Sequence, residues 1–222
     1  MKLSIPQTVS DEVAVKKADI LTEVSDYYTQ KLAEHGQTAR GVDWNGIESQ
    51  SLRFSQLCKV IQEPDFSIID LGCGYGALLD HLDSRYNSFS YCGIDISEAM
   101  IETAKTRFEN RSNTEFSVSS FPRRTADYSV ASGIFNVRLD RTEEEWTEYM
   151  LSTLDVLDKY SEKGFAFNCL TSYSDEPLKK SNLFYADPCW LFDVCKSKYS
   201  RNVALLHDYN LYEFTILVRK AL

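Results

Sequence analysis

The stretch IIDLGCGYGALLDHL, residues 68–82, constrains the fold more than any other part of the chain. An apolar run ends at Asp70, glycines follow at positions 72, 74 and 76, and a helical pattern of apolar residues then begins. Glycine lets the backbone turn tightly and approach a ligand where a Cβ atom would clash. The stretch therefore predicts a strand, a ligand-binding turn and a helix.

A regular alternation of strand-like and helix-like segments runs onward from Ser67. Short apolar runs alternate with segments whose apolar residues recur at three- and four-residue spacing. Such alternation predicts a parallel sheet covered by helices on both faces. The expected strands are 67–72, 89–97, 114–120, 126–136 and 164–173, and the expected helices are 76–86, 98–110, 142–160 and one that begins at Asp187-Pro188.

The last segment, residues 203–220, consists of two apolar runs around a polar turn, which is typical of a hairpin. We expect its first strand to run parallel to its neighbours in the sheet. Its second strand must then be antiparallel. The predicted fold class is α/β, a doubly wound sheet with a single reversed strand at the C-terminal end.

The part of the chain before the sheet is predicted to be helical. Apolar residues recur at helical spacing from about residue 10 to 35, a turn rich in Gly and Asn follows at 41–46, and a second helix is expected over 47–61. Pro64 follows this helix. We therefore expect two regions, a helical one over residues 1–64 and the sheet-containing core over residues 65–222.

The composition of the chain restricts the classes of partner that it is expected to bind. The 222 residues include 24 basic and 33 acidic ones, and the net charge of −9 disfavours a nucleic acid as partner. The N-terminal sequence lacks the apolar core of a signal peptide, and no run approaches the length of a membrane span, so we expect a cytoplasmic protein without a membrane partner. Six cysteines form no CxxC pair, so no metal site is predicted. A monomer and a homodimer are both compatible with the sequence.

Two classes of cofactor fit the glycine turn. Asp95, 23 residues after Gly72, ends the next predicted strand, where an acid commonly accepts hydrogen bonds from ribose hydroxyls. A nicotinamide dinucleotide fits this pattern, because Ala77 is an allowed variant at the sixth position of its fingerprint. Asp70 favours a ligand with an ammonium group instead, since a carboxylate beside the turn would repel a pyrophosphate.

The motif DLGCGYG, together with Asp95, resembles the class I S-adenosylmethionine-dependent methyltransferases. The resemblance covers about residues 67–220 and implies a Rossmann-like, seven-stranded sheet with a reversed C-terminal strand, beneath an N-terminal helical cap. It also implies an enzyme that transfers a methyl group from S-adenosylmethionine to a small molecule, at an oxygen or nitrogen atom. A protein acceptor is the alternative, and a nicotinamide-dependent oxidoreductase is the other interpretation of the turn.

The resemblance implies a role for each part of the turn and its surroundings. The turn and its leading acid would meet the methionine part of the cofactor, Asp95 would bind the ribose hydroxyls, and residues after the second and third strands would border the adenine. Aromatic and cationic residues of the cap would cover the cofactor. The expected cofactor-binding residues are Tyr28, Arg40, Asp70, Gly72, Cys73, Gly74, Asp95, Ile96, Met100, Ser120, Phe121 and Ser132.

Catalytic and substrate-binding residues are expected at the carboxyl edge of the sheet, where the methyl group would lie. The polar turn after the sixth strand supplies His207, our candidate general base, and Tyr209. His81, on the helix after the glycine turn, is expected to face solvent. The candidate substrate-binding residues are Trp44, Asn136, Arg138, Tyr173 and Tyr185.

Overall fold

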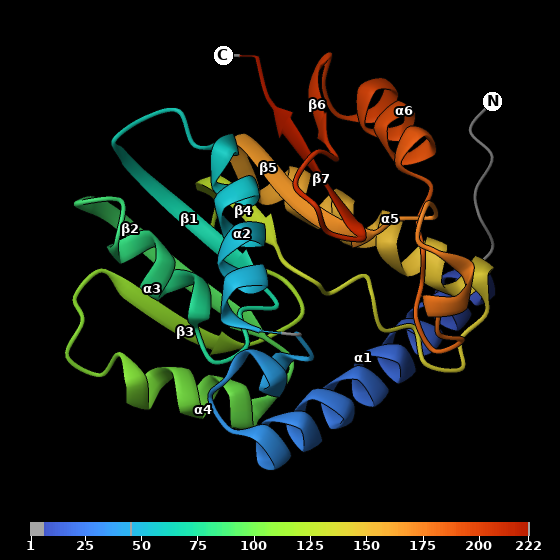
Figure 1. Cartoon of the computed structure of the whole chain (residues 1–222), viewed down its shortest axis with the longest axis horizontal. Helices are drawn as coiled ribbons and strands as arrows, with labels where there is room; N and C mark the ends of the chain where they lie inside the picture. The colour runs from blue at the N-terminus through green and yellow to red at the C-terminus, as the bar shows by residue number, and fades with distance from the viewer. Residues whose placement is uncertain (1–6, 45, 222) are drawn as a thin grey trace.

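A computed structural model describes residues 7–44 and 46–221 of the chain. Its centre is a seven-stranded sheet with the strand order β3-β2-β1-β4-β5-β7-β6 (Figure 1). The strands are β1 (Asp65–Leu71), β2 (Ser88–Asp95), β3 (Thr114–Val118), β4 (Ala126–Ala131), β5 (Ser161–Leu170), β6 (Asn202–Leu206) and β7 (Glu213–Arg219).

The directions of the strands confirm the predicted reversed strand. β1 pairs in parallel with β2 and β4, β2 with β3, and β4 with β5, whereas β7 pairs antiparallel with both β5 and β6. The expectation that the sixth strand runs parallel to its neighbour was wrong, because that neighbour is the reversed strand. β6 nevertheless points in the same direction as β1–β5, so its carboxyl end lies at the same edge of the sheet as theirs.

Helices cover both faces of the sheet. The α-helices are α1 (Gln7–His35), α2 (Ile47–Leu57), α3 (Ala77–Asp83), α4 (Glu98–Arg107), α5 (Glu143–Tyr160) and α6 (Pro188–Lys198), and short 3-10 turns are η1 (Ala39–Val42), η2 (Cys58–Val60) and η3 (Glu176–Leu178). α2, α3 and α4 share one apolar core with the sheet, and α5, α6 and part of α1 share the other. Because helices cover both faces, the inner strands β4 and β7 are buried at almost every position.

The N-terminal helix lies across the carboxyl edge of the sheet rather than on either face (Figure 1). Ile20 and Val24 of α1 are buried in the core that α5 shares. The hydroxyl of Ser25 donates to the carbonyl of Ile96 at 3.3 Å, and the hydroxyls of Thr29 and Ser97 are 2.7 Å apart. These contacts attach α1 to the loop that follows β2, at the edge where ligands bind in such sheets.

β4 is shorter than predicted. It ends at Ala131 rather than at Asn136, and Gly133 adopts a φ of 77°, which only glycine takes without strain. Ser132, Gly133, Asn136 and Arg138 therefore lie in the connection between β4 and α5, and not in the strand as expected. The apolar composition of this segment suggested a longer strand, but the turn at Gly133 ends the pairing.

His81 is buried, which contradicts the expectation that it faces solvent. Its ring packs edge-on against Phe54 of α2, with ring centroids 5.6 Å apart, and Arg85 Nη1 is 3.1 Å from its Nδ1. Burial, with a smaller effect from Arg85, lowers the pKa of His81 to about 4. The packing of α2 on α3 decides this position.

None of the helices in the described part of the chain has the length and apolar character needed to cross a bilayer.

The first turn of α5 contains a complete capping box. The Thr142 hydroxyl accepts a hydrogen bond from the Glu145 amide at 3.2 Å, and the Glu145 carboxylate accepts one from the Thr142 amide at 3.2 Å. These bonds satisfy amide groups that have no partner within the helix. α5 supports the sheet through the fully buried Trp146, whose indole donates to the carbonyl of Phe135 at 2.8 Å.

We expect Thr142→Ala to lower the free energy of unfolding by about 1 kcal/mol, the usual effect of losing an N-cap side chain. Urea denaturation followed by circular dichroism measures the change. Thr106→Ala is the matched control, because this exposed hydroxyl bonds only to the carbonyl of Glu102 within its own helix. Equal stabilities of the two variants would contradict a capping role for Thr142.

Candidate active site

A cavity of about 770 Å³ opens at the carboxyl edge of the sheet. Its floor consists of the glycine turn and the residues that follow β2, β3 and β4, and its walls come from α1, η1 and α5. The lining residues are Leu21, Val24, Tyr28, Val42, Trp44, Leu71, Gly72, Gly74, Ile94, Asp95, Ile96, Met100, Ser119, Ser120, Ser132, Gly133, Ile134, Tyr149 and Thr153.

A second cavity of about 330 Å³ adjoins the first. It lies between the glycine turn and α2, and Asp70, Cys73, Gln50 and Phe54 are among the residues that line it. Five residues line both cavities, namely Val42, Trp44, Gly72, Gly74 and Ser132. The two cavities are therefore compartments of one site that meet above the glycine turn.

The glycine turn has the open backbone that a bound ligand requires. Gly72 and Gly74 have positive φ angles of 79° and 53°, and the amides of Gly72 and Cys73 donate to the carbonyl of Ile94 at 2.7 and 3.0 Å. A Cβ atom at Gly72 would clash with the side chain of Ile134, and one at Gly74 would lie 3.1 Å from Val42. The positive φ angles, the clash at Gly72 and the tight contact at Gly74 all disfavour a side chain at these two positions.

Asp95 fixes the turn from the end of β2. Its Oδ2 accepts a hydrogen bond from the Gly74 amide at 2.8 Å, and its Oδ1 accepts one from the Ser97 amide at 2.9 Å. Burial raises the pKa of the carboxyl group, and these backbone donors counteract the increase. A carboxylate has about four acceptor positions, so each oxygen can accept a further hydrogen bond from a ligand hydroxyl.

Asp70 is the second acid of the site and lines the smaller cavity. Its Oδ2 accepts a 2.6 Å hydrogen bond from the Tyr91 hydroxyl, and its side chain is buried. Burial raises the pKa of Asp70 to about 7, although the Tyr91 bond lowers it, and the nearby Asp95 adds to the increase. A buried acid whose pKa is near neutral favours a cationic ligand group, which would stabilise its ionised form.

Ser132 adds a polar group at the junction of the two cavities. Its hydroxyl is buried and has no hydrogen-bond partner among the described residues. An unpaired buried hydroxyl is uncommon, because desolvation without a partner costs free energy. The hydroxyl is therefore available to a polar group of a ligand that spans the junction.

Most of the residues expected to bind the cofactor line these cavities. The larger cavity contains Tyr28, Gly72, Gly74, Asp95, Ile96, Met100, Ser120 and Ser132, and the smaller one adds Asp70 and Cys73. Trp44, expected to contact substrate, lines both. Arg40 and Phe121 lie outside the two linings and are exposed.

Four residues expected to bind substrate lie elsewhere. Asn136 is buried and accepts a hydrogen bond from the Leu170 amide at 3.0 Å. The guanidinium of Arg138 donates to the carbonyls of Leu183, Arg141 and Ser181, so it supports the loop after β5. Tyr185 accepts a hydrogen bond from the Lys180 amide at 2.9 Å, and Tyr173 is exposed.

The two candidate catalytic residues are also remote from the cavities. β6 is three positions from β4 in the sheet, and neither His207 nor Tyr209 lines either cavity. The His207 ring contacts Tyr173 and Phe214. The Tyr209 hydroxyl is 3.0 Å from the Thr215 hydroxyl, and burial raises the tyrosine pKa above its usual value. Both residues follow a strand at the correct edge, but at the wrong end of the strand order.

Several lining residues had no distinguishing signal in the sequence. Leu21 and Val24 of α1, Val42 of η1, and Tyr149 and Thr153 of α5 border the larger cavity. The sequence places each of them on a helix or turn without indicating which side faces the ligand. Ile134 was unmarked for a similar reason, since it was expected to lie within a strand.

The comparisons with known proteins agree with this geometry. The family model described as "Methyltransferase domain" matches residues 68–158. Rv1506c of Mycobacterium tuberculosis (strain ATCC 25618 / H37Rv), which carries a methyltransferase name, is 60% identical over 156 residues, or 70% of this chain and 94% of that protein. The chain thus belongs to the class I S-adenosylmethionine-dependent methyltransferases.

Solved structures support the fold at lower identity. DhpI in its complex with SAH has a TM-score of 0.61 at 12% identity, over 89% of this chain and 95% of that one. Human N-acetylserotonin methyltransferase in complex with SAM has a TM-score of 0.56 at 18% identity, over 79% of this chain and 53% of that one. These likenesses show that the sheet and its flanking helices have the same architecture.

The raised pKa of Asp70 predicts a dependence of stability on pH. An unfolded Asp ionises near pH 4, whereas folded Asp70 keeps its proton up to about pH 7, so its contribution to stability is present below about pH 4 and is lost as the pH rises through about 7. Asp70→Asn stays neutral and loses nothing. We expect the variant to gain a few kcal/mol, on the order of 3, relative to the native chain between about pH 4 and pH 8.

Urea denaturation of both proteins across this pH range measures the difference. Asp80→Asn is a suitable control, because Asp80 is an exposed acid on α3 that pairs with Arg107. Parallel curves for the native chain and Asp70→Asn would contradict the raised pKa.

Proposed function

We propose that this chain transfers a methyl group from S-adenosylmethionine to an uncharged, largely apolar small molecule, at a nitrogen or oxygen atom. The observation that carries the proposal is the pair of acids that line the cavities beside the glycine turn, Asp70 and Asp95. Asp95 in the larger cavity matches a ribose, and Asp70 in the smaller one matches an ammonium group. S-adenosylmethionine carries both groups, whereas a nicotinamide dinucleotide carries a pyrophosphate that Asp70 would repel.

The chemistry of the lining residues suits the two ends of the cofactor. Asp95 would accept hydrogen bonds from the ribose hydroxyls, and Ile96, Met100 and Ser120 would border the adenine. The open backbone of Gly72 and Gly74 would lie under the methionine part. The names of solved structures with this fold include complexes with SAH or SAM, which supports the assignment of the cofactor.

When bound, S-adenosylmethionine supplies a methyl group on a positively charged sulfur, which is already activated for transfer. The chain must then place the acceptor in line with the methyl group and keep water out. The apolar side chains of α1, η1 and α5 around the larger cavity suit both tasks. They come from the helices that cover the carboxyl edge of the sheet.

Beyond Asp70 and Asp95, the two acids that we assign to the cofactor, the cavities offer no evident general base. No His, Lys or Arg occurs among the described residues that line them. The lining tyrosines Tyr28 and Tyr149 have raised pKa values because of burial, and so does the Cys73 thiol. We infer that the acceptor brings its own nucleophile, such as an unprotonated amine or an acidic hydroxyl, and that no cationic side chain selects for an anionic acceptor.

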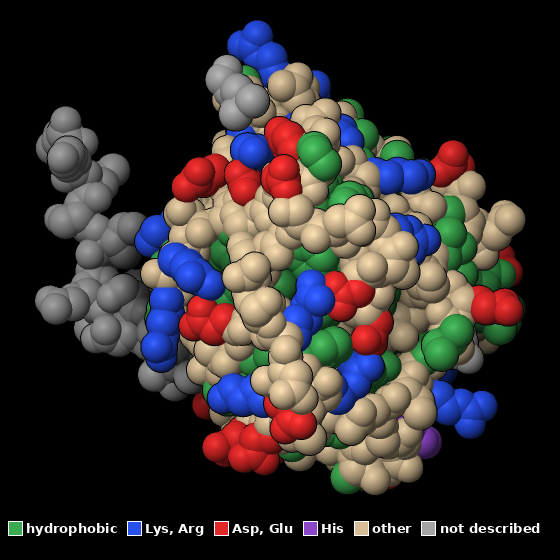
Figure 2. Space-filling model, turned by 90° about the vertical axis from the view of Figure 1, so that its left-hand side faces the viewer, with side chains coloured by type: hydrophobic (Ala, Val, Ile, Leu, Met, Phe, Trp, Pro, Cys, Tyr) green, Lys and Arg blue, Asp and Glu red, His purple; other side chains and the backbone are tan. Residues whose placement is uncertain are grey.

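A macromolecular acceptor fits less well. On the face shown in Figure 2, basic and acidic side chains are interspersed rather than gathered in one basic patch. This pattern does not favour binding to a nucleic-acid backbone. A protein acceptor would have to insert a side chain into the cavity beneath α1 and η1, which makes a small molecule the simpler occupant.

Binding of S-adenosylhomocysteine tests the cofactor assignment. We expect Asp95→Ala to weaken binding on the order of 100-fold, because two hydrogen bonds to a charged group are lost. Isothermal titration calorimetry on the folded proteins measures this loss. Asp80→Ala, an exposed acid on the neighbouring helix α3, should bind as tightly as the native chain. Failure of the native chain to bind S-adenosylhomocysteine would overturn the proposal.

Identification of the acceptor tests the second part of the proposal, the transfer of a methyl group to a small molecule. The native chain, S-adenosylmethionine and fractionated small-molecule extracts should yield a product heavier by one methyl substitution, detected by mass spectrometry. Because no side chain supplies a base, we expect the rate to rise with the ionisation of the acceptor itself as the pH increases. Asp95→Ala is the negative control. A mass increase of one methyl substitution that is found only in proteins of the extract would instead favour a protein acceptor.

A further inference from the structure

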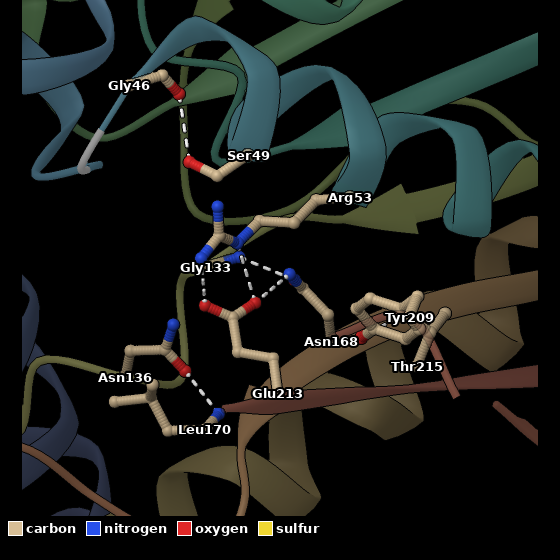
Figure 3. Close-up of polar contacts among 10 residues, drawn as sticks. All are labelled: Gly46, Ser49, Arg53, Gly133, Asn136, Asn168, Leu170, Tyr209, Glu213 and Thr215. Atoms are coloured by element: carbon tan, nitrogen blue, oxygen red, sulfur yellow. Dashed lines mark hydrogen bonds and ion pairs between the residues drawn. The ribbon is translucent and has the colours of Figure 1, made fainter. Parts of the chain in front are cut away.

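A buried ion pair joins α2 to the reversed strand β7 next to the site. The guanidinium of Arg53 on α2 donates from Nε and Nη2 to the two carboxylate oxygens of Glu213, at 2.8 and 2.7 Å. Arg53 and Glu213, the latter at the start of β7, are only 6% and 1% exposed. The two residues are 160 positions apart in the chain, so the pair fixes α2 against the far half of the sheet (Figure 3).

The ion pair continues into the floor of the larger cavity. Asn168 of β5 is fully buried, and its Nδ2 donates to Glu213 Oε2 at 2.8 Å. The Oδ1 of the same amide accepts a hydrogen bond from the Gly133 amide at 2.8 Å (Figure 3). This bond holds the turn after β4 at the position where Gly133 lines the cavity.

The same guanidinium also holds a wall of the site. Its central carbon lies 3.9 Å from the centroid of the Trp44 ring. The other boundary of Trp44 is Gly133, where an added Cβ atom would clash with the indole. Trp44 is thus confined between Arg53 and Gly133, and both of its neighbours are held by Glu213 and Asn168.

Trp44 occupies a decisive place in the site. It lines both cavities, which would hold the nucleoside and the methionine part of the cofactor. The sulfur of S-adenosylmethionine joins these two parts, so the residues that line both cavities would border the sulfur and its methyl group. A wall at this position limits where an acceptor can approach.

The arrangement is poorly suited to stabilising the fold alone. Two charges are removed from water, and Nη1 of Arg53 is buried without a partner among the described residues. In Figure 3 this third nitrogen points away from Glu213, on the side of Ser49. A buried ion pair with an unsatisfied donor is often less stabilising than apolar side chains of the same size.

We propose that Arg53, Glu213 and Asn168 are positioning residues for methyl transfer, which fix Trp44 and the turn at Gly133 around the transferred methyl group. The inference rests on the proposed function, because the place of the methyl group follows from the cofactor. The network itself is a property of the free protein and can be tested without a ligand.

The test uses the double variant Arg53→Met with Glu213→Leu, which removes the pair without leaving a lone buried charge. Arg53→Lys is the second variant, because it keeps the charge but loses the planar group that stacks on Trp44. The fluorescence of Trp44 is obtained as the difference in emission between each protein and its Trp44→Phe counterpart. Acrylamide quenching of this signal, binding of S-adenosylhomocysteine and the free energy of unfolding are measured for each protein.

We expect both variants to fold, the Trp44 signal to become more accessible to acrylamide, and S-adenosylhomocysteine to bind about tenfold more weakly. Lys163→Met is the control, because it removes ion pairs with Asp127 and Glu63 remote from the cavities and should change neither readout. Unchanged quenching and binding in both variants would overturn the proposal, whatever happens to stability.

If the proposed function is wrong, the measurements give a result that differs from the one that overturns the positioning role. The native chain would then not bind S-adenosylhomocysteine, while the quenching of Trp44 in the free protein would still decide whether Arg53 holds the ring.

Discussion

The hydrogen bond from the Gly74 amide to Asp95 is the interaction on which the site depends most directly. It joins the turn after β1 to the end of β2 and holds the backbone of the turn against the Asp95 carboxylate. The glycines make the turn possible, because their φ angles are positive and Ile134 and Val42 lie close to the positions that their side chains would take. The acid therefore both shapes the turn and presents its remaining acceptor positions to a ligand.

The strands and the helices contribute different groups to the site around the glycine turn. The ends of the parallel strands supply the polar groups, because their loops meet at one edge of the sheet. The helical cap and α5 supply an apolar wall that completes the cavity. The strand ends suit recognition of a polar cofactor, and the helices suit selection of an apolar acceptor. Both belong to cores that also hold the fold together, so site and scaffold share the same packing.

Buried polar groups are concentrated at this edge. Asp70 with Tyr91, Asp95 with two amides, Asn168 with Gly133, and Arg53 with Glu213 all lie within or beside the cavities. Burying each of these groups costs desolvation free energy. The clearest sign of this cost is the pKa of Asp70, which burial raises. Such groups are expected where a protein must hold a ligand precisely, since apolar packing alone gives no directional contacts.

The sequence by itself determined the fold class and the acid-glycine part of the site. The alternation of strand and helix, the reversed last strand, and the pattern of Asp70, the glycines and Asp95 are local in the chain, and local patterns survive folding. The extent of β4 was overestimated because a single turn at Gly133 ended the pairing of an apolar segment. His207 and Tyr209 were assigned to the correct edge of the sheet, but only the tertiary structure showed that they follow a strand three positions from β4 and line neither cavity. The tertiary structure alone decided that Trp44 lies between Arg53 and Gly133, and that Tyr28 and Tyr149 face the same cavity, because these contacts join segments that are distant in sequence and have no shared pattern.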